Sequence, residues 1–276
     1  MQRFHYISAD LDKPEESARV VAETTVWNSG SPPDVVWCYA GGLRLTLPFV
    51  DVSVPRLREK MVNNYFTSVY MARAIIQAWL DTSSVNTSSA ADARPIVGAS
   101  QKTAAENTRR LLFTAPSIVF RSSTRYGTYS PTMEALRSLS DSLSQKMNLY
   151  AVTTPIRAHT VHPEAICAEP YVTGDNPEMM EFMKLMESYK GQGAKQVAQF
   201  YVRRLGISLI KITMTLLTKL AMYIIFGGSI GGGFWKGLLD WLITCVISLV
   251  MVFVRMAMDG MIRRWVREQW QRSKDR

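Results

Sequence analysis

The sequence predicts a doubly wound α/β fold, in which helices cover both faces of a parallel sheet. Short apolar runs alternate along the chain with longer amphipathic helices, and this alternation is typical of parallel sheets. The apolar residues are also unevenly distributed, because they crowd into 205–258. The chain of 276 residues is therefore expected to combine one α/β domain with C-terminal membrane helices.

Periodicity and turn residues predict the individual elements. Apolar residues recur every three or four positions over 54–80 and over 131–150, which predicts two amphipathic helices. A shorter helix over 14–22 is predicted because Asp12 and Pro14 are favourable at a helix start. Apolar runs bounded by turn residues predict the strands, which cover 4–8, 34–39, 111–114 and 149–153.

Two apolar segments, 207–226 and 238–254, are the candidates for membrane insertion. A spanning helix needs roughly 20 apolar residues, and the second segment has 17, with Asp240 as its one charged residue. The first segment contains Lys211 and Lys219, which are costly at the centre of a bilayer, so it is expected in the interface. The alternative is that both segments are buried helices of a soluble core.

The positive charge of the chain indicates lipid and not nucleic acid as a partner. The net charge is +9, but the globular part has no compact run of Lys and Arg interleaved with aromatic residues. After Val254 the tail carries seven basic and three acidic residues, and 7 − 3 gives +4. This tail favours a cytosolic C-terminus. Because the N-terminus has no secretory signal, both ends are expected in the cytosol.

The cysteines and histidines predict no metal site. Cys38, Cys167 and Cys245 are widely spaced and odd in number, so they form neither a ligand cluster nor a disulfide framework. The histidines show no paired-ligand spacing. A reducing compartment is the simpler expectation.

Four segments carry a resemblance to a known family. They are SADLDKPEESARVVAETTVWNSGSPPDVVWCYAG at 8–41, NNYFTSVYMARAIIQAWL at 63–80, YSPTMEALRSLSDSL at 129–143 and LLDWLITCVISLVMVFVRMAMDGMIRRW at 238–265. Together they resemble short-chain dehydrogenases/reductases, and in detail the fungal 3-ketodihydrosphingosine reductases. The resemblance implies a Rossmann-like domain without its first βαβ elements, so an N-terminally truncated one. It also implies reduction of 3-ketodihydrosphingosine to dihydrosphingosine with NADPH, on the cytosolic face of the endoplasmic reticulum.

The resemblance assigns catalytic roles to particular residues. Tyr129 matches the tyrosine that protonates the developing alkoxide, and Asn64 matches the asparagine that supports the proton relay. The family's substrate-binding serine falls at Pro116, which makes the adjacent Ser117 the candidate. The lysine four residues after the tyrosine falls at Met133, and methionine cannot supply its charge.

The resemblance also assigns residues to the cofactor. Asp10 and Leu11 match the pair that lines the adenine, Ala40 and Gly41 match the turn beside the ribose, and Pro163 matches the turn near the nicotinamide. A dinucleotide-binding fold opens with a strand, a Gly-rich turn and a helix that holds the pyrophosphate, and this sequence contains no such unit. The chain alone is therefore expected to show no saturable NADPH binding.

Three parts and two main functions are expected. The parts are a truncated short-chain dehydrogenase domain over 1–175, a helical substrate-side segment over 176–206 and a membrane anchor with a basic tail over 207–276. The first function is the NADPH-dependent reduction, with a sphingoid-base lipid as substrate. The alternative is a catalytically inactive relative that acts as a membrane-bound partner of an active reductase, or the product of an incomplete gene. Homo-oligomers are compatible with both, and a membrane scaffold is a third possibility.

Overall fold

The computed structural model describes residues 3–42, 49–89, 108–120, 126–147, 155–163, 166–167, 192–204, 211–213 and 234–274. The chain forms two compact units. The first comprises Met1–Ile166 with Gly193–Ile212, and the second comprises Cys167–Gln192 with Thr213–Arg276. All the candidate site residues lie in the first unit.

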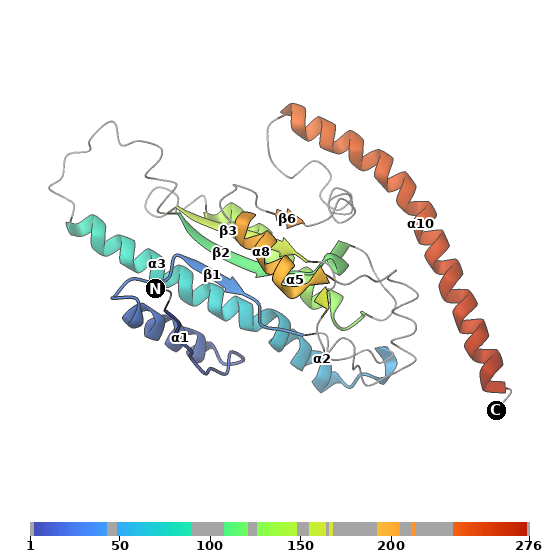
Figure 1. Ribbon diagram of the computed structural model, residues 1–276, viewed down its shortest axis with the longest axis horizontal. Coiled ribbons are helices and arrows are strands. Elements are labelled where there is room, and N and C mark those ends of the chain that lie inside the picture. The colour runs from blue at the N-terminus through green and yellow to red at the C-terminus, as the bar shows by residue number, and fades with distance from the viewer. Residues whose placement is uncertain are drawn as a thin grey trace. The chain divides into compact units, whose positions relative to one another are not determined.

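A four-stranded sheet, whose first three strands are parallel, forms the centre of the first unit (Figure 1). Its strands, in the spatial order β1-β2-β3-β6, are β1 (Val35–Cys38), β2 (Arg109–Thr114), β3 (Ile156–His162) and β6 (Lys211–Thr213). β1 pairs with β2 and β2 with β3, both in parallel, so that Trp37, Leu112 and His159 lie opposite one another. The parallel sheet and the strands predicted at 34–39 and 111–114 are confirmed.

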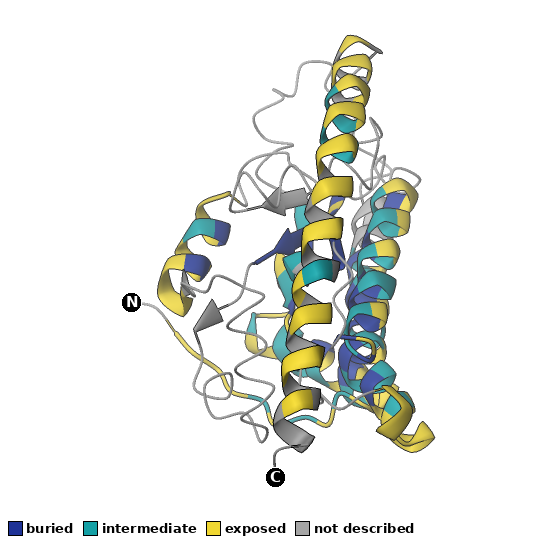
Figure 2. Cartoon of the chain, turned by 90° about the vertical axis from the view of Figure 1, so that its right-hand side faces the viewer, coloured by how far each residue is buried: buried dark blue, intermediate teal, exposed yellow. Residues whose placement is uncertain are grey.

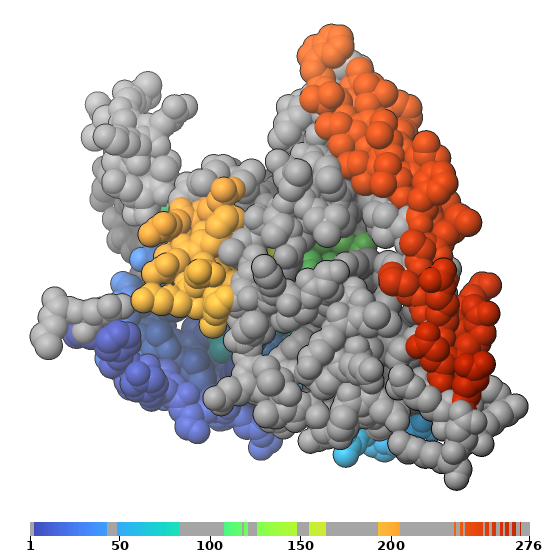
Figure 3. Space-filling view, turned by 45° about the vertical axis from the view of Figure 1, so that its right-hand side comes forward, coloured from blue at the N-terminus to red at the C-terminus, as the bar shows by residue number. Residues whose placement is uncertain are grey.

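Helices cover both faces of this sheet. The described helices of the first unit are α1 (Pro14–Trp27), α2 (Val54–Met61), α3 (Thr67–Ser89), α5 (Ser130–Lys146) and α8 (Ala194–Arg204). α3 and α5 pack on the strands, and α1 packs on α3. Successive strand residues face opposite ways, so Cys38 faces these helices while Trp37 faces α8, where it contacts Tyr201 edge-to-face. α8 lies at the surface (Figure 3), and the predicted two-sided arrangement is confirmed.

The core lies between the sheet and the pair α3 and α5. Leu111 and Phe113 of β2 are fully buried against Ile75 and Trp79 of α3 and Leu136 of α5. Figure 2 shows the buried residues on the sides of the helices that face the sheet. The Trp79 indole N–H donates to the Pro33 carbonyl at 2.8 Å, so this large side chain is buried without an unsatisfied donor. This hydrogen bond connects α3 to the loop that leads into β1.

A π-helical turn, Val62–Phe66, interrupts the long helix predicted over 54–80. It joins α2 to α3 without a break in the helical path and carries Asn64, which is fully buried. π-helical turns contain one extra residue per turn and occur frequently at functional sites. The turn also packs against α5. The predicted helix is therefore confirmed, and its departure from α geometry occurs at a candidate site residue.

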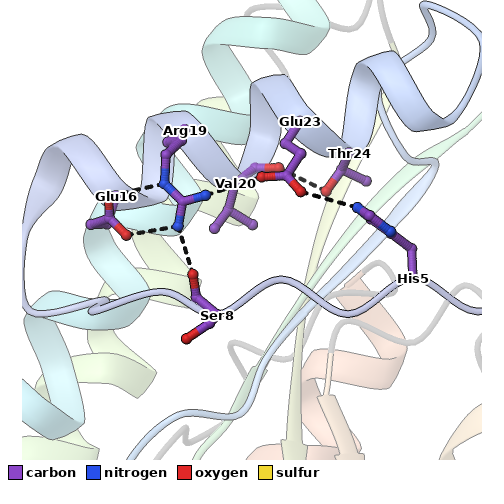
Figure 4. A network of polar contacts seen from close by, with 7 residues as sticks. All are labelled: His5, Ser8, Glu16, Arg19, Val20, Glu23 and Thr24. Atoms are coloured by element: carbon purple, nitrogen blue, oxygen red, sulfur yellow. Dashed lines mark hydrogen bonds and ion pairs between the residues drawn. The ribbon is translucent and has the colours of Figure 1, made fainter.

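The strand predicted over 4–8 is wrong. Residues 3–10 have no secondary structure and run beside α1 (Figure 4). Arg19 donates to the Ser8 carbonyl at 2.6 Å, and His5 lies 3.1 Å from Glu23. A β-type sequence becomes a strand only if another strand accepts its backbone hydrogen bonds, and in the described sheets no strand pairs with this segment.

The strand predicted over 149–153 lies outside the described residues. Among the described residues, the next strand after α5 is β3, Ile156–His162. Shorter elements complete the described chain: the 3-10 turns η1 (Phe49–Asp51) and η3 (Ser117–Phe120), and the two-stranded pair β4 (Ile166–Cys167) and β5 (Gln192–Gly193).

The C-terminal region differs from the expected pair of membrane segments. Within 207–226, Lys211–Thr213 forms the strand β6 of the central sheet, so this segment is not one continuous helix; the rest of it lies outside the described residues. Ile212 and Thr213 are β-branched, which favours a strand. The segment 238–254 belongs to α10 (Phe234–Lys274), and Leu239, like most described residues of this helix, is exposed. Of the helices among the described residues, none is both long enough and apolar enough to cross a membrane.

Candidate active site

Four of the candidate residues lie just beyond the carboxyl ends of three neighbouring parallel strands. Ala40 and Gly41 follow β1, Ser117 begins the turn after β2, and Pro163 comes directly after β3. Carboxyl ends of parallel strands meet at one edge of the sheet, where open α/β sheets bind their ligands. The topology therefore brings these residues, which are far apart in sequence, to one edge.

Asn64 links this edge to Tyr129. Its side-chain oxygen accepts a hydrogen bond from the Gly42 N–H at 2.8 Å, and its amide nitrogen donates to the Thr132 hydroxyl at 3.0 Å. Thr132 in turn donates to the Tyr129 carbonyl at 2.7 Å. Because Asn64 is fully buried, both of its polar groups need these partners. The two candidates Asn64 and Tyr129 thus belong to one hydrogen-bonded network.

A glycine is required at position 41, because the backbone there passes very close to Asn64. Its φ of +141° lies in a region that side chains rarely adopt, and an added Cβ would lie 3.0 Å from the Asn64 side-chain oxygen. Gly42, one residue later, has open space where a Cβ would be. The close approach is therefore specific to Gly41, which lets the turn after β1 pass directly over the Asn64 amide.

The Tyr129 phenol is held in its protonated form. Tyr129 precedes the first residue of α5 and is half-buried; burial raises its pKa above the usual range, and the nearby Tyr39 phenol raises this pKa further. One helical turn later stands Met133, which is 4% exposed and donates its backbone N–H to the Tyr129 carbonyl. The side chain at that position brings no positive charge, so Tyr129 keeps a proton that it releases with difficulty.

Ser117 and Pro163 contact each other through the backbone. The Ser117 N–H donates to the Pro163 carbonyl at 2.8 Å, and the Ala115 N–H donates to the Val161 carbonyl at 3.0 Å. These two hydrogen bonds extend the pairing with β3 beyond the end of β2. Ser117 begins η3, which packs against α5, the helix that begins beside Tyr129. This packing places the start of η3 on the same side of the sheet edge as Tyr129.

Leu11 and Ala40 line one cavity of about 430 Å³ beside β1. Its described walls are apolar or neutral, with Val36 from β1 and Val21 from α1 among them. Asp10 is not in the lining; it pairs with Lys13 at 3.1 Å on the surface. An apolar cavity of this kind suits a flat heteroaromatic ring such as adenine. Its described lining contains no Lys or Arg side chain that could pair with the phosphates of a dinucleotide.

Cys38, at the end of β1, is a buried structural residue of that cavity wall. Desolvation raises the pKa of its thiol to about 12, so the thiol is neutral at physiological pH. A neutral thiol is neither a nucleophile nor a metal ligand. Cys38 therefore belongs to the packed core beside the cavity.

Three further residues belong to the network although the sequence did not indicate them. Thr132 bridges Asn64 to Tyr129. The Gly42 N–H donates to the Asn64 side-chain oxygen, and the Gly42 carbonyl accepts from the Lys60 ammonium, 2.9 Å away. These contacts join segments that are distant in sequence. The one local signal was the spacing of Lys60 and Asn64, which are four residues apart on a predicted helix.

Comparison with known proteins identifies relatives of the chain. No protein-family model matches the chain. It is 31% identical over 268 residues to a 3-ketodihydrosphingosine reductase of Neurospora crassa, covering 97% of this chain and 68% of the relative. It is 38% identical over 176 residues to a 3-ketodihydrosphingosine reductase of Aspergillus fumigatus, covering 60% of this chain and 44% of that one.

Solved structures show the same fold. A putative short-chain dehydrogenase of Novosphingobium aromaticivorans superposes with a TM-score of 0.57 at 12% identity, covering 94% of this chain and 78% of that chain. A short-chain dehydrogenase of Burkholderia cenocepacia, solved in complex with NADP, has a TM-score of 0.53 at 14% identity, covering 77% and 70%. On the sequence identity to the Neurospora crassa protein and on this shared fold, the chain belongs to the 3-ketodihydrosphingosine reductase family of short-chain dehydrogenases/reductases.

Proposed function

We propose that this chain carries the substrate and proton-donor side of an NADPH-dependent reductase that converts 3-ketodihydrosphingosine to dihydrosphingosine. The observation that supports this best is the network in which Asn64 binds both the turn after β1 and, through Thr132, the start of the helix that follows Tyr129. It fixes the backbone of Tyr129, the residue that carries the candidate proton-donating phenol, relative to the turn after β1. The names of the curated relatives supply the substrate.

Different residues of the chain would have different roles in such a reaction. NADPH, when bound, would supply the hydride. Tyr129 would donate its proton to the oxygen of the reduced ketone, Ser117 would hold the ketone oxygen, and Asn64 would keep Tyr129 in place. Leu11 and Ala40 would contact the adenine in their apolar cavity. The remaining polar groups of the cofactor require a Gly-rich turn at a helix N-terminus.

The test compares the chain with a fusion that places a strand, a Gly-rich turn and a helix in front of it. The chain alone is expected to show no saturable NADPH binding by fluorescence or calorimetry, because nothing in it matches a pyrophosphate-binding turn. The fusion is expected to bind NADPH and to oxidise it in the presence of 3-ketodihydrosphingosine. Tyr129→Phe in the fusion should lower turnover on the order of 100-fold or more without weakening NADPH binding.

A matched control and two adverse outcomes make this test decisive. Tyr70→Phe, on α3, removes a phenol that stacks on Phe66 and should leave turnover unchanged. Turnover by the chain alone would overturn the need for the Gly-rich turn. Turnover that Tyr129→Phe leaves intact would overturn the role of Tyr129.

A second candidate function is a non-catalytic family member that acts as the membrane-bound partner of an active reductase. The buried Met133 favours it, because the side chain one turn after Tyr129 cannot lower the pKa of the phenol. A fusion that binds NADPH but does not turn over the ketone would select this function over the first. Co-purification with a catalytically complete reductase, measured with tagged copies of both, would then be expected.

We also propose that α10 attaches the chain to the endoplasmic reticulum membrane, with the α/β part in the cytosol. The support comes from the sequence. The segment 238–254 is apolar apart from Asp240. Trp235 precedes it, Trp241 lies near its start, and the tail that follows is basic. The full chain is expected to float with vesicles of phosphatidylcholine and phosphatidylserine in a density gradient. A chain ending at residue 233 should stay in the soluble fraction. Full-length protein that does not float would refute the attachment.

A further inference from the structure

Lys60 is a buried lysine that the reaction proposed above does not use. It is 5% exposed, whereas the other charged residues of α2, Arg56, Arg58 and Glu59, are exposed. Its ammonium donates to the Gly42 carbonyl at 2.9 Å. Lysine is among the residues least often fully buried, and a buried ammonium requires good acceptors. The burial of Lys60 therefore calls for a reason beyond the amphipathic pattern of the helix.

Lys60 and Asn64 hold the two ends of the same residue. Asn64 accepts from the Gly42 N–H at 2.8 Å while Lys60 donates to the Gly42 carbonyl. The two side chains come from positions four residues apart, at the end of α2 and in the π-helical turn, so they project to the same side. Because both its N–H and its carbonyl are hydrogen-bonded, the backbone dihedral angles of Gly42 are restricted.

The turn held in this way is the part of the candidate site that most needs support. Gly41 has φ of +141° and approaches Asn64 closely, and glycine has a wide choice of backbone conformations when nothing restrains it. Two consecutive glycines after β1 would therefore leave the turn variable. The contacts from Lys60 and Asn64 select one path for it at the carboxyl edge of the sheet.

The π-helical turn reaches the neighbouring loop as well. With its amide nitrogen turned toward Asp12, Asn63 donates to the two carboxylate oxygens at 3.2 and 3.1 Å. Asp12 directly follows Leu11, which lines the cavity beside β1. Adjacent residues of one helical turn thus hold both loops that border the candidate cofactor side.

We infer that Lys60 is a positioning residue, which fixes the Gly41–Gly42 turn against Asn64 and thereby shapes the cofactor side of the site. The inference rests on the proposed function for the identity of the cofactor, but not for the role of Lys60 in the turn. A simpler alternative is that the lysine stem only fills space beside the helix. The two readings differ in what happens when the ammonium alone is removed.

The experiment is hydrogen exchange of the full chain without any ligand, with Lys60→Met, Lys60→Arg and Lys13→Met compared to the unmodified protein. Lys60→Met keeps an unbranched apolar stem and is expected to speed exchange in a fragment containing 39–42 on the order of tenfold, with β2 and β3 unchanged. Lys60→Arg retains a donor and should restore most of the protection. Lys13→Met, which removes an exposed ion pair with Asp10, should leave the fragment unchanged.

Two results would overturn the inference. Unchanged exchange in 39–42 would show that Asn64 alone fixes the turn. Equal acceleration in β2 and β3 would show that Lys60 supports the whole unit and not this turn. Because no cofactor is present, failure of the NADPH proposal does not affect this measurement; in the NADPH-binding fusion, Lys60→Met should in addition raise the Kd for NADPH on the order of tenfold, with rescue by Lys60→Arg.

Discussion

Replacing Asn64 by alanine is expected to lower the free energy of unfolding of the first unit by about 2–4 kcal/mol. The substitution removes the acceptor of the Gly42 N–H and the donor to the Thr132 hydroxyl, and it leaves a gap at a fully buried position. Each buried polar group that loses its partner costs about 1–3 kcal/mol, although Gly42 is partly exposed and recovers some of this from water. Urea unfolding followed by circular dichroism measures the loss.

A control variant and a double-mutant cycle distinguish the stability lost with the hydrogen-bond network from the stability lost with packing. Asn28→Ala removes a half-buried asparagine whose side chain donates to the Ser31 carbonyl in an exposed hydrogen bond, and it should cost about 0.5 kcal/mol or less. Combining Asn64→Ala with Thr132→Val should reveal a coupling of about 0.5–1.5 kcal/mol, because the two side chains share a hydrogen bond. An Asn64→Ala loss as small as that of Asn28→Ala would show that the network does not stabilise the fold.

The elements that could be predicted from the sequence are those with strong local patterns. β1 and β2 are apolar on both faces because helices cover both sides of the sheet, and a continuous apolar run reveals such a strand. α3 and α5 show the periodicity of helices with one buried side. Tyr129 and Asn64 were assigned by resemblance, and the structure places them in one network through Thr132. Their catalytic roles stay predictions.

The features that could not be predicted depend on contacts between distant segments. The periodicity of apolar residues cannot reveal the π-helical turn. A π-helical turn contains one more residue than an α-helical turn, but its residue types are the same as those of an α-helix. Residues 4–8 have β-type composition but are held to α1 by Arg19 and His5 instead of by a strand. β6 lies within an apolar run that resembled a helix, since short apolar runs suit both elements.

Replacing Met133 by lysine is expected to lower the pKa of the Tyr129 phenol by at least about one unit. Met133 follows Tyr129 by one helical turn, so an ammonium on that side chain lies on the same side of α5 as the phenol. Burial now raises the pKa of Tyr129, and a nearby positive charge acts in the opposite direction by favouring the phenolate. Ultraviolet difference absorbance of tyrosinate during a pH titration measures the change.

The titration needs a matched set of variants, because the chain has 11 tyrosines. The Tyr129 signal is isolated by subtracting the titration of each protein combined with Tyr129→Phe. Met133→Leu keeps the apolar volume and should leave the pKa of Tyr129 unchanged, whereas Met133→Lys should lower it and also reduce stability, since position 133 is buried. If the two variants titrate alike while circular dichroism shows both folded, the ammonium does not reach the phenol. If the pKa falls and turnover of the NADPH-binding fusion rises, the absence of a cation at position 133 is what limits proton donation by Tyr129.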